Sequence, residues 1–137
     1  MVYVPYFAIV AAFLLIFVPR FVVTREMAKQ QGGYDNHDPR AQQTRLDGLG
    51  RRALGAHNNG FEAFAPFVAG VLAAAQRGVN LELAAALCAL FVVARSIYVA
   101  AYLSNKASLR SSMWTLGTIA SLVLLISAAV TSHPSAW

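Results

Sequence analysis

The sequence predicts an all-α membrane protein, a four-transmembrane-helix bundle that forms one domain over residues 1–137. Composition is the first reason, since 58% of the residues are apolar and only 12% are charged, against about 25% in a soluble domain. The second reason is that the apolar residues form four long runs, and a bilayer span needs about 17–25 of them. We therefore expect spans at roughly residues 3–23, 57–76, 82–103 and 112–131, and a cytoplasmic loop over 24–56.

The first run, Tyr3–Val23, is long enough to cross the membrane by itself. No Lys or Arg precedes it and no small-x-small cleavage site follows it, so a true span fits better than a signal peptide. Pro19 lies near its exit side, where we expect the helix to end or kink.

The second run, Phe61–Ala75, is the weakest because it is short and contains Glu62 and Pro66. It reaches spanning length only if its helix starts near His57. Pro66 should kink this helix and free a backbone carbonyl.

The third and fourth runs, Leu83–Leu103 and Met113–Val130, each qualify as spans alone. Two spans also carry pairs of small residues one helical turn apart, which let helices approach closely in lipid. The second span has Gly70 with Ala74, and the fourth has Gly117 with Ser121.

Lys and Arg are concentrated on alternate connections. Six lie between the first and second spans, the turn after the third span holds Lys106 and Arg110, and the turn after the second holds only Arg77. The positive-inside rule then places both termini outside. Short loops and the lack of targeting signals fit a bacterial inner membrane, with both termini periplasmic.

The net charge of +5 does not indicate nucleic-acid binding, because the basic residues flank the spans and no nucleic-acid motif accompanies them. We expect membrane lipids to be their partners. Cys88 is the single cysteine, which excludes an intramolecular disulfide. Asp35, His37 and Asp38 match no standard ligand spacing, so we expect no metal site.

Two charges at membrane depth are the main functional clue, because such charges are tolerated only where they face a partner, a cavity or a ligand. Arg95 lies about 12 Å from the inner end of its span, and Glu62 lies near the inner end of the span before it. Arg95, Tyr98 and Tyr102 share one helix face, as do Asn59 and Glu62. With Arg110 and Ser111, at the start of the fourth span, three helices bring polar groups to the inner boundary.

Such a group of cations and hydroxyls around one carboxylate suits a ligand with carboxylates and an amine. Glutathione has this charge pattern, and an apolar co-substrate would reach the site through the lipid. The spacing alone leaves a structural alternative equally open, in which Arg95 and Glu62 pair only to fasten the bundle.

Two motifs give these residues a recognisable order. The stretch RALGAHNNGFEAFAPF, residues 52–67, and the stretch RSIYVAAY, residues 95–102, which is followed by LRS at 109–111, resemble the signatures of the MAPEG family. That family comprises membrane-associated proteins in eicosanoid and glutathione metabolism. The resemblance implies a homotrimer of four-helix bundles with glutathione between neighbouring subunits, near the cytoplasmic face.

The resemblance also implies roles for individual residues. Arg110 or Ser111 would stabilise the glutathione thiolate. Other positions are similar to glutathione contacts of the family: Asn59, Glu62, Arg95 and Tyr102, with Tyr98 on the same face, and His57 and Arg25 as weaker matches. A catalytic member that makes prostaglandin E has arginines in place of Gly55 and Asn58, a histidine in place of Tyr98 and a tyrosine in place of Trp114.

Three functions compete on this sequence. The first is a glutathione-dependent transferase or peroxidase that acts on lipophilic electrophiles or lipid hydroperoxides, in the manner of a microsomal glutathione S-transferase. The second is a non-catalytic lipid-binding or scaffold protein, for which the altered Gly55, Asn58 and Tyr98 would be signs of lost chemistry. A channel or transporter is disfavoured, since neither repeats nor broken helices are visible.

Overall fold

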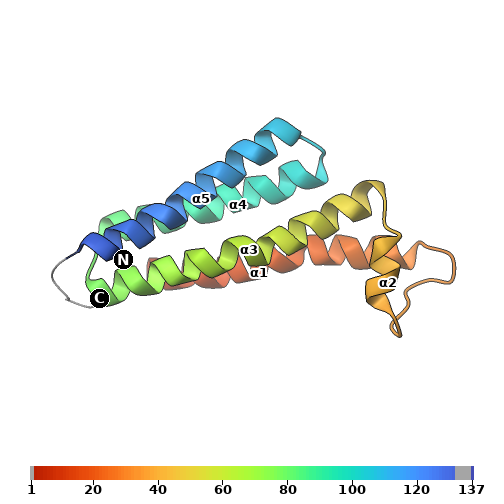
Figure 1. Ribbon diagram of the computed structural model, residues 1–137, viewed down its shortest axis with the longest axis horizontal. Coiled ribbons are helices and arrows are strands. Elements are labelled where there is room, and N and C mark those ends of the chain that lie inside the picture. Colours follow the sequence, from red (N-terminus) through yellow and green to blue (C-terminus); the bar gives the residue numbers. More distant parts are fainter. Residues whose placement is uncertain (1, 132–136) are drawn as a thin grey trace.

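The computed structural model describes residues 2–131 and 137, and this part of the chain is helical and contains no strand (Figure 1). The all-α fold is therefore confirmed. Four long helices and one short helix follow each other along the chain. They are α1 (Tyr3–Ala28), α2 (Pro39–Thr44), α3 (Gly48–Arg77), α4 (Leu81–Leu103) and α5 (Ala107–Val130).

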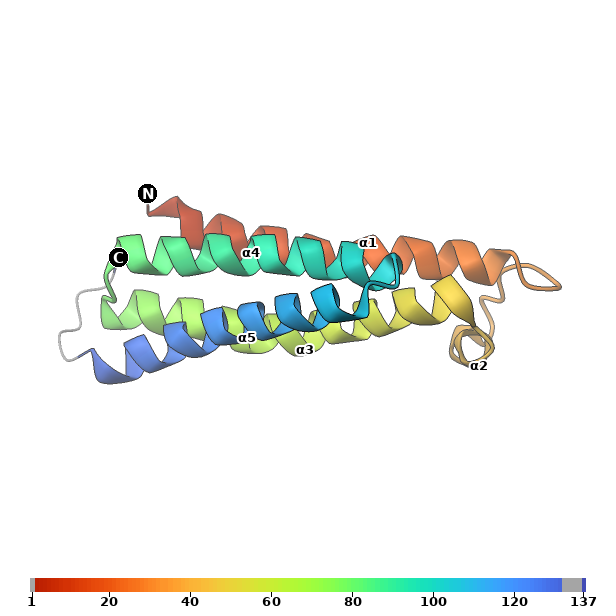
Figure 2. The ribbon, with the colours of Figure 1, turned by 90° about the horizontal axis from the view of Figure 1, so that it is seen from above.

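The four long helices lie side by side, with α1 packed against α3 and α4, and α5 packed against α3 and α4 (Figures 1 and 2). The start of α1, the turn between α3 and α4, and the end of α5 lie at one end of the bundle. The segment that carries α2 and the turn between α4 and α5 lie at the other end. The two basic connections identified from the sequence therefore share one end of the molecule.

Within the described residues, α1, α4 and α5 are long and apolar enough to cross a membrane. The chain is thus an integral membrane protein by its helices. Helix α3 is 30 residues long, but it carries more charged residues than any of the other three long helices. The fourth span stays a prediction.

Residues 24–56, which we expected to form a loop, contain the end of α1, all of α2 and the first turns of α3. Helix α3 begins at Gly48 because Gly50, Ala53 and Ala56 recur at helical spacing and are buried. Ala53 belongs to a small apolar cluster with Val23 and Met27 of α1. Packing against α1 thus extends α3 beyond the segment that apolar content alone predicts.

The connection between α1 and α2 is organised by the side chain of Gln42, which is 1% exposed. Its amide oxygen accepts the N–H of Asp35 at 2.9 Å, and its amide nitrogen donates to the carbonyls of Met27 at 3.1 Å and Gly33 at 2.7 Å. The Asp38 side chain caps α2 by accepting the N–H of Ala41. This polar connection therefore has a defined structure.

Pro19 and Pro66 each lie inside a continuous helix, so α1 does not end at Pro19, and the kinks that we expected at the two prolines stay predictions. Near Pro19 the ring nitrogen Nδ1 of His57 lies 2.8 Å from the carbonyl oxygen of Ile16, one turn before the proline. A side chain of α3 thus supports the α1 backbone where a proline weakens the helical hydrogen bonding.

Candidate functional site

Arg95 of α4 is buried, with 5% of its surface exposed, and its side chain reaches across α5 towards α3. The Arg95 side chain passes beside Gly117 of α5, where a Cβ atom built on the glycine would lie at an ordinary contact distance of 3.4 Å from Arg95 Cδ. The guanidinium donates from Nη1 to Asn59 Oδ1 at 3.0 Å and from Nη2 to the Asn59 carbonyl at 3.5 Å. Three helices therefore meet at this one side chain.

Glu62 does not pair directly with Arg95. Among the described residues the ion pair within 4.0 Å is the surface contact between Lys29 and Glu26, at 2.6 Å. Asn59 stands between the two charges, because its Nδ2 donates to Glu62 Oε2 at 2.7 Å. The Glu62 side chain itself is exposed. The direct pair, one of the two readings that the sequence left open, is thus replaced by an amide bridge.

Aromatic rings continue the site from Arg95 to the start of α5. The Arg95 guanidinium lies 4.0 Å from the centre of the Tyr98 ring, which packs edge-on against Tyr102 with 5.6 Å between ring centres. The Arg110 guanidinium lies 4.7 Å from the centre of the Tyr102 ring. Such cation–π contacts stabilise a cation where it is partly removed from water. The predicted face of Arg95, Tyr98 and Tyr102 is thus a stack of two rings between two guanidinium groups, which ends at Arg110.

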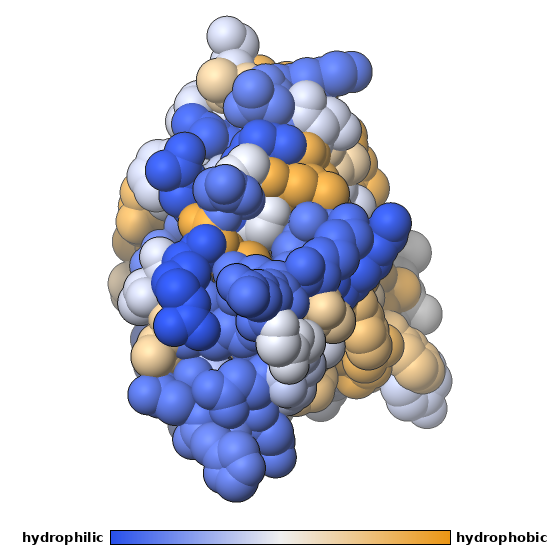
Figure 3. Space-filling model, turned by 90° about the vertical axis from the view of Figure 1, so that its right-hand side faces the viewer, coloured by the Kyte–Doolittle hydropathy of each residue, from blue (hydrophilic) through white to orange (hydrophobic). Residues whose placement is uncertain are grey.

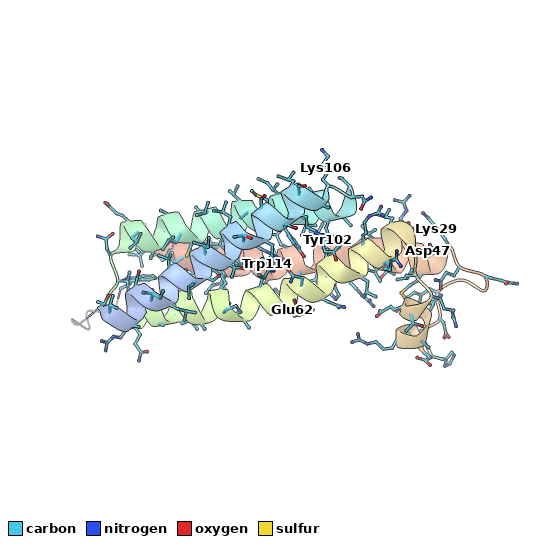
Figure 4. All side chains as sticks on the ribbon, turned by 45° about the horizontal axis from the view of Figure 1, so that its top comes forward. Lys29, Asp47, Glu62, Tyr102, Lys106 and Trp114 are labelled. Carbon is cyan, nitrogen blue, oxygen red and sulfur yellow. The ribbon has the colours of Figure 1, made fainter. Side chains whose placement is uncertain are left out.

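A polar cavity of about 490 Å³ opens beside this stack, between α3, α4 and α5. Figure 4 labels Tyr102 and Trp114, which lie along the stretch where α5 passes α3. The cavity is lined by Asn59, Tyr98, Tyr102, Arg110, Ser111, Trp114 and Thr115.

An apolar groove of about 290 Å³ adjoins the polar cavity farther along α3 and α5. Asn59 and Trp114 line both spaces, so they mark the boundary between them. Arg95 and Glu62 line the end of the groove nearest this boundary. The rest of the groove is lined by Ala63, Pro66, Phe91, Thr118, Ser121, Leu122 and Leu125.

The residues of α5 change from polar to apolar along one face. Trp114 follows Arg110 by four residues and Ser111 by three, and Thr118 follows Trp114 by four, so these side chains share a face. Trp114 was not among the site residues that we expected from the sequence. Its helical spacing from Arg110 and Ser111 is the signal that identifies it.

Two expected site residues lie outside both spaces. Arg25 is exposed in the last turn of α1. His57 contacts the Ile16 carbonyl and packs against the rings of Phe17 and Phe61, at 6.2 and 5.2 Å between ring centres. The structure thus brings together the other seven expected residues, whereas within one chain His57 serves as a contact between α1 and α3.

The end of the bundle that the polar cavity approaches is strongly hydrophilic (Figure 3). Arg52 contributes a contact that the sequence did not predict, since its Nε and Nη2 both lie 3.4 Å from the carbonyl oxygen of Leu103, at the end of α4. A cation at a helix C-terminus stabilises the exposed carbonyls there. The other Lys and Arg residues of the two connections at this end are Arg25, Lys29, Arg40, Arg45, Arg51, Lys106 and Arg110.

This arrangement can hold an amphiphilic pair of ligands. The polar cavity offers a guanidinium and several hydroxyl groups, which bind carboxylates and stabilise a thiolate. The apolar groove offers a contiguous surface for a hydrocarbon group. Both spaces meet at Trp114, where groups bound in each would come into contact.

Comparison with known protein families gives a match. The model of the MAPEG family matches residues 4–130, which is nearly the whole chain. No curated protein matches the chain, and no solved structure does.

Proposed function

Because this chain belongs to the MAPEG family, we propose that it is an integral membrane, glutathione-dependent transferase or peroxidase that acts on lipophilic electrophiles or lipid hydroperoxides. The family includes glutathione transferases and related enzymes. The observation that carries the proposal is the contact between a polar cavity and an apolar groove at Trp114. A soluble thiol and a lipophilic co-substrate would meet at that boundary.

Arg110 and Ser111 are the proposed catalytic residues. A free thiol has a pKa of about 8.5 and is mostly protonated at neutral pH, so a positive charge or hydroxyl donor beside it raises the thiolate fraction. Arg110 and Ser111 line the polar cavity together. With a chlorinated aromatic co-substrate, the sulfur would bond to the ring carbon, the C–Cl bond would break and chloride would leave with the electron pair.

The remaining cavity residues would hold the tripeptide. Tyr98 and Tyr102 line the polar cavity with Asn59, and Glu62, at the adjoining end of the groove, presents an exposed carboxylate for an ammonium group. Arg95 contacts this group of residues through its hydrogen bond to the Asn59 side chain. In this proposal, His57 and Arg25 bind glutathione only where a neighbouring subunit brings a second cavity beside them.

The homotrimer is part of the proposal, and the exposed face of α3 supports it. Polar and small side chains on that face suit a protein neighbour better than lipid. A second and third copy of α3 packed there would also make α3 the fourth span. The exposed residues of this face are Asn58, Glu62, Ala65, Ala69, Leu72 and Gln76, of which only Leu72 is a large apolar residue.

Orientation follows the positive-inside rule. The two basic connections share one end of the bundle, and the start of α1 and end of α5 lie at the opposite end. We place the basic end in the cytoplasm and both termini in the periplasm of a bacterial inner membrane. Glutathione would then enter the polar cavity from the cytoplasm.

The test is a conjugation assay with purified protein in detergent, glutathione and a chlorinated dinitrobenzene. The wild-type protein should show turnover above background, and Arg110→Ala should lower kcat at least tenfold because the thiolate loses its guanidinium. Lys106→Ala is the matched control, since it removes an exposed cation four residues away. Absence of turnover in the wild-type protein, with no effect of Arg110→Ala on glutathione binding, would refute the enzyme.

A second candidate is a non-catalytic lipid-binding or scaffold protein of the same fold. The observation in its favour is that the Arg95 guanidinium is already engaged by Asn59 and Tyr98, which leaves Arg110 as the cation lining the polar cavity. Thermal unfolding distinguishes the two functions, because a ligand that binds the folded state raises Tm with concentration. Glutathione should raise Tm if the enzyme proposal is right, and fatty acids alone should raise it for the scaffold.

A further inference from the structure

We infer that Arg95 is a positioning residue that acts through Asn59 to orient the Glu62 carboxylate, and that it does not bind the ligand itself. The inference rests on the proposed function, in which the Glu62 carboxylate faces the ammonium group of glutathione. It changes the role that the sequence suggested for Arg95, from a ligand contact to a support behind the contact.

The protein groups around Arg95 already occupy much of its guanidinium and leave few of its donors for a ligand. It is 5% exposed, both terminal nitrogens donate to Asn59, and its face lies against the Tyr98 ring. Arg95 lines the end of the groove beside Glu62, and it is Arg110 that lines the polar cavity, where carboxylates of the tripeptide would bind. A ligand carboxylate would have to compete with Asn59 for the two terminal nitrogens of the guanidinium.

The amide of Asn59 has one orientation that satisfies both neighbours. A guanidinium has donors only, so it requires the amide oxygen. The amide nitrogen then points to Glu62, whose ionised carboxylate has acceptors only. Arg95 thus determines which way the amide lies, and the amide determines where one carboxylate oxygen of Glu62 is held.

The position of Glu62 makes such a support useful. Its side chain is exposed and lies three residues after Asn59 on the same helix face. Without the bridge the carboxylate is free to turn away from the cavity, since a glutamate side chain has several rotatable bonds. The bridge keeps it beside the boundary of the two spaces.

The test compares glutathione with an analogue in which hydrogen replaces the α-amino group. Binding of both ligands is measured by titration calorimetry in detergent for wild type, Arg95→Met, Glu62→Gln and the double variant. Each single substitution should weaken glutathione binding about tenfold and leave the deamino analogue unchanged, since only the ammonium contact is lost. The double variant should bind glutathione no more weakly than the worse single variant.

Two further variants separate positioning from folding and from general charge. Arg95→Lys should keep most of the preference for glutathione, because one ammonium donor still reaches the Asn59 oxygen, whereas a forked grip on a ligand carboxylate would be lost. Lys106→Met removes an exposed cation and should change neither affinity. Thermal unfolding of each variant shows whether the protein is folded.

The outcomes are distinct. A wild-type protein that binds neither ligand overturns the proposed function, and the positioning role with it. Wild-type binding of glutathione, with equal binding by Arg95→Met, overturns the positioning role alone. Equal weakening of both ligands by Arg95→Met, or multiplied effects in the double variant, would mean that Arg95 contacts the ligand directly or fastens the helices only.

Discussion

Tyr102 of α4 lies directly against Gly55 of α3, so that a Cβ atom built on Gly55 would be 2.5 Å from the Tyr102 hydroxyl oxygen and 3.0 Å from Cζ. Residue 55 therefore has no room for a side chain while Tyr102 keeps its position. This contact links the missing side chain at 55 to the aromatic stack that ends at Arg110.

We expect Gly55→Ala to lower kcat/KM strongly and to change Tm only slightly. The added methyl group must push the Tyr102 ring away from α3 and so disturb its contact with Arg110. Alanine is the better helix former by about 1 kcal/mol, which offsets part of the lost packing. The value of kcat/KM should fall by up to about a hundredfold, with a Tm within a few degrees of wild type.

Tyr102→Phe provides the control for that prediction. It removes the hydroxyl that lies nearest to Gly55, so the double variant should lose less activity than the separate effects predict. Additive losses in kcat/KM would show that Gly55 acts on the site by another route.

Gly117 is the second glycine whose space is used by a site residue. The Arg95 arm passes beside it, with Cδ 3.4 Å from a built Cβ atom, which is an ordinary contact distance. Gly117→Ala should therefore leave the unfolding free energy within about 1 kcal/mol of wild type. Gly117→Leu should lower it by about 1–3 kcal/mol, because the larger side chain overlaps the arm. Thermal unfolding in detergent measures both, and equal stability of the two variants would contradict this account of Gly117.

The sequence predicted the broad organisation of the site for a physical reason. Charges in an apolar span must face other protein groups, and helical spacing put Arg95, Tyr98 and Tyr102 on one face. The all-α fold and the MAPEG family are confirmed on the same residues. Helix boundaries within the polar segment were not predictable from apolar content, because the extension of α3 to Gly48 depends on packing against α1.

The bridge between Arg95 and Glu62 could not be read from spacing alone. Depth and opposite charge predict only that the two side chains are neighbours. Whether they pair directly depends on which atoms α3 presents to α4, and here that is the amide of Asn59. The role of Gly117 is likewise a three-helix property, since its pairing with Ser121 in the sequence indicates close packing but not the passing of an arginine.

Gln42 should determine the order of the connection between α1 and α3. Gln42→Leu removes its contacts with Asp35, Met27 and Gly33 and leaves these backbone groups without that partner. Each unsatisfied buried group costs about 1–3 kcal/mol, so the connection should open while the apolar helices stay folded.

Limited trypsin digestion measures this opening, since Arg40 and Arg45 flank Gln42 and are exposed. Cleavage at these two sites should become faster in Gln42→Leu and stay at the wild-type rate in Gln31→Leu, where the replaced glutamine is exposed. Unchanged cleavage in Gln42→Leu would show that the buried amide does not hold the connection.

Trp114 should determine which lipophilic co-substrates react. It is 46% exposed and lines both the polar cavity and the apolar groove, and the other residue that lines both, Asn59, has its amide engaged by Arg95 and Glu62. An indole at this boundary offers a flat surface on which an aromatic electrophile can stack, which contributes about 0.5–1.5 kcal/mol beyond burial. Trp114→Leu should therefore raise KM for a chlorinated dinitrobenzene by about threefold to tenfold and leave KM for an alkyl iodide nearly unchanged.

Trp114→Phe is the control, and it should retain most of the preference for the aromatic co-substrate because it keeps a ring at the boundary. The dissociation constant for glutathione should change little in either variant, which separates this effect from damage to the polar cavity. A Trp114→Leu enzyme that loses both co-substrates equally would show that the indole supports the cavity wall and does not select the electrophile.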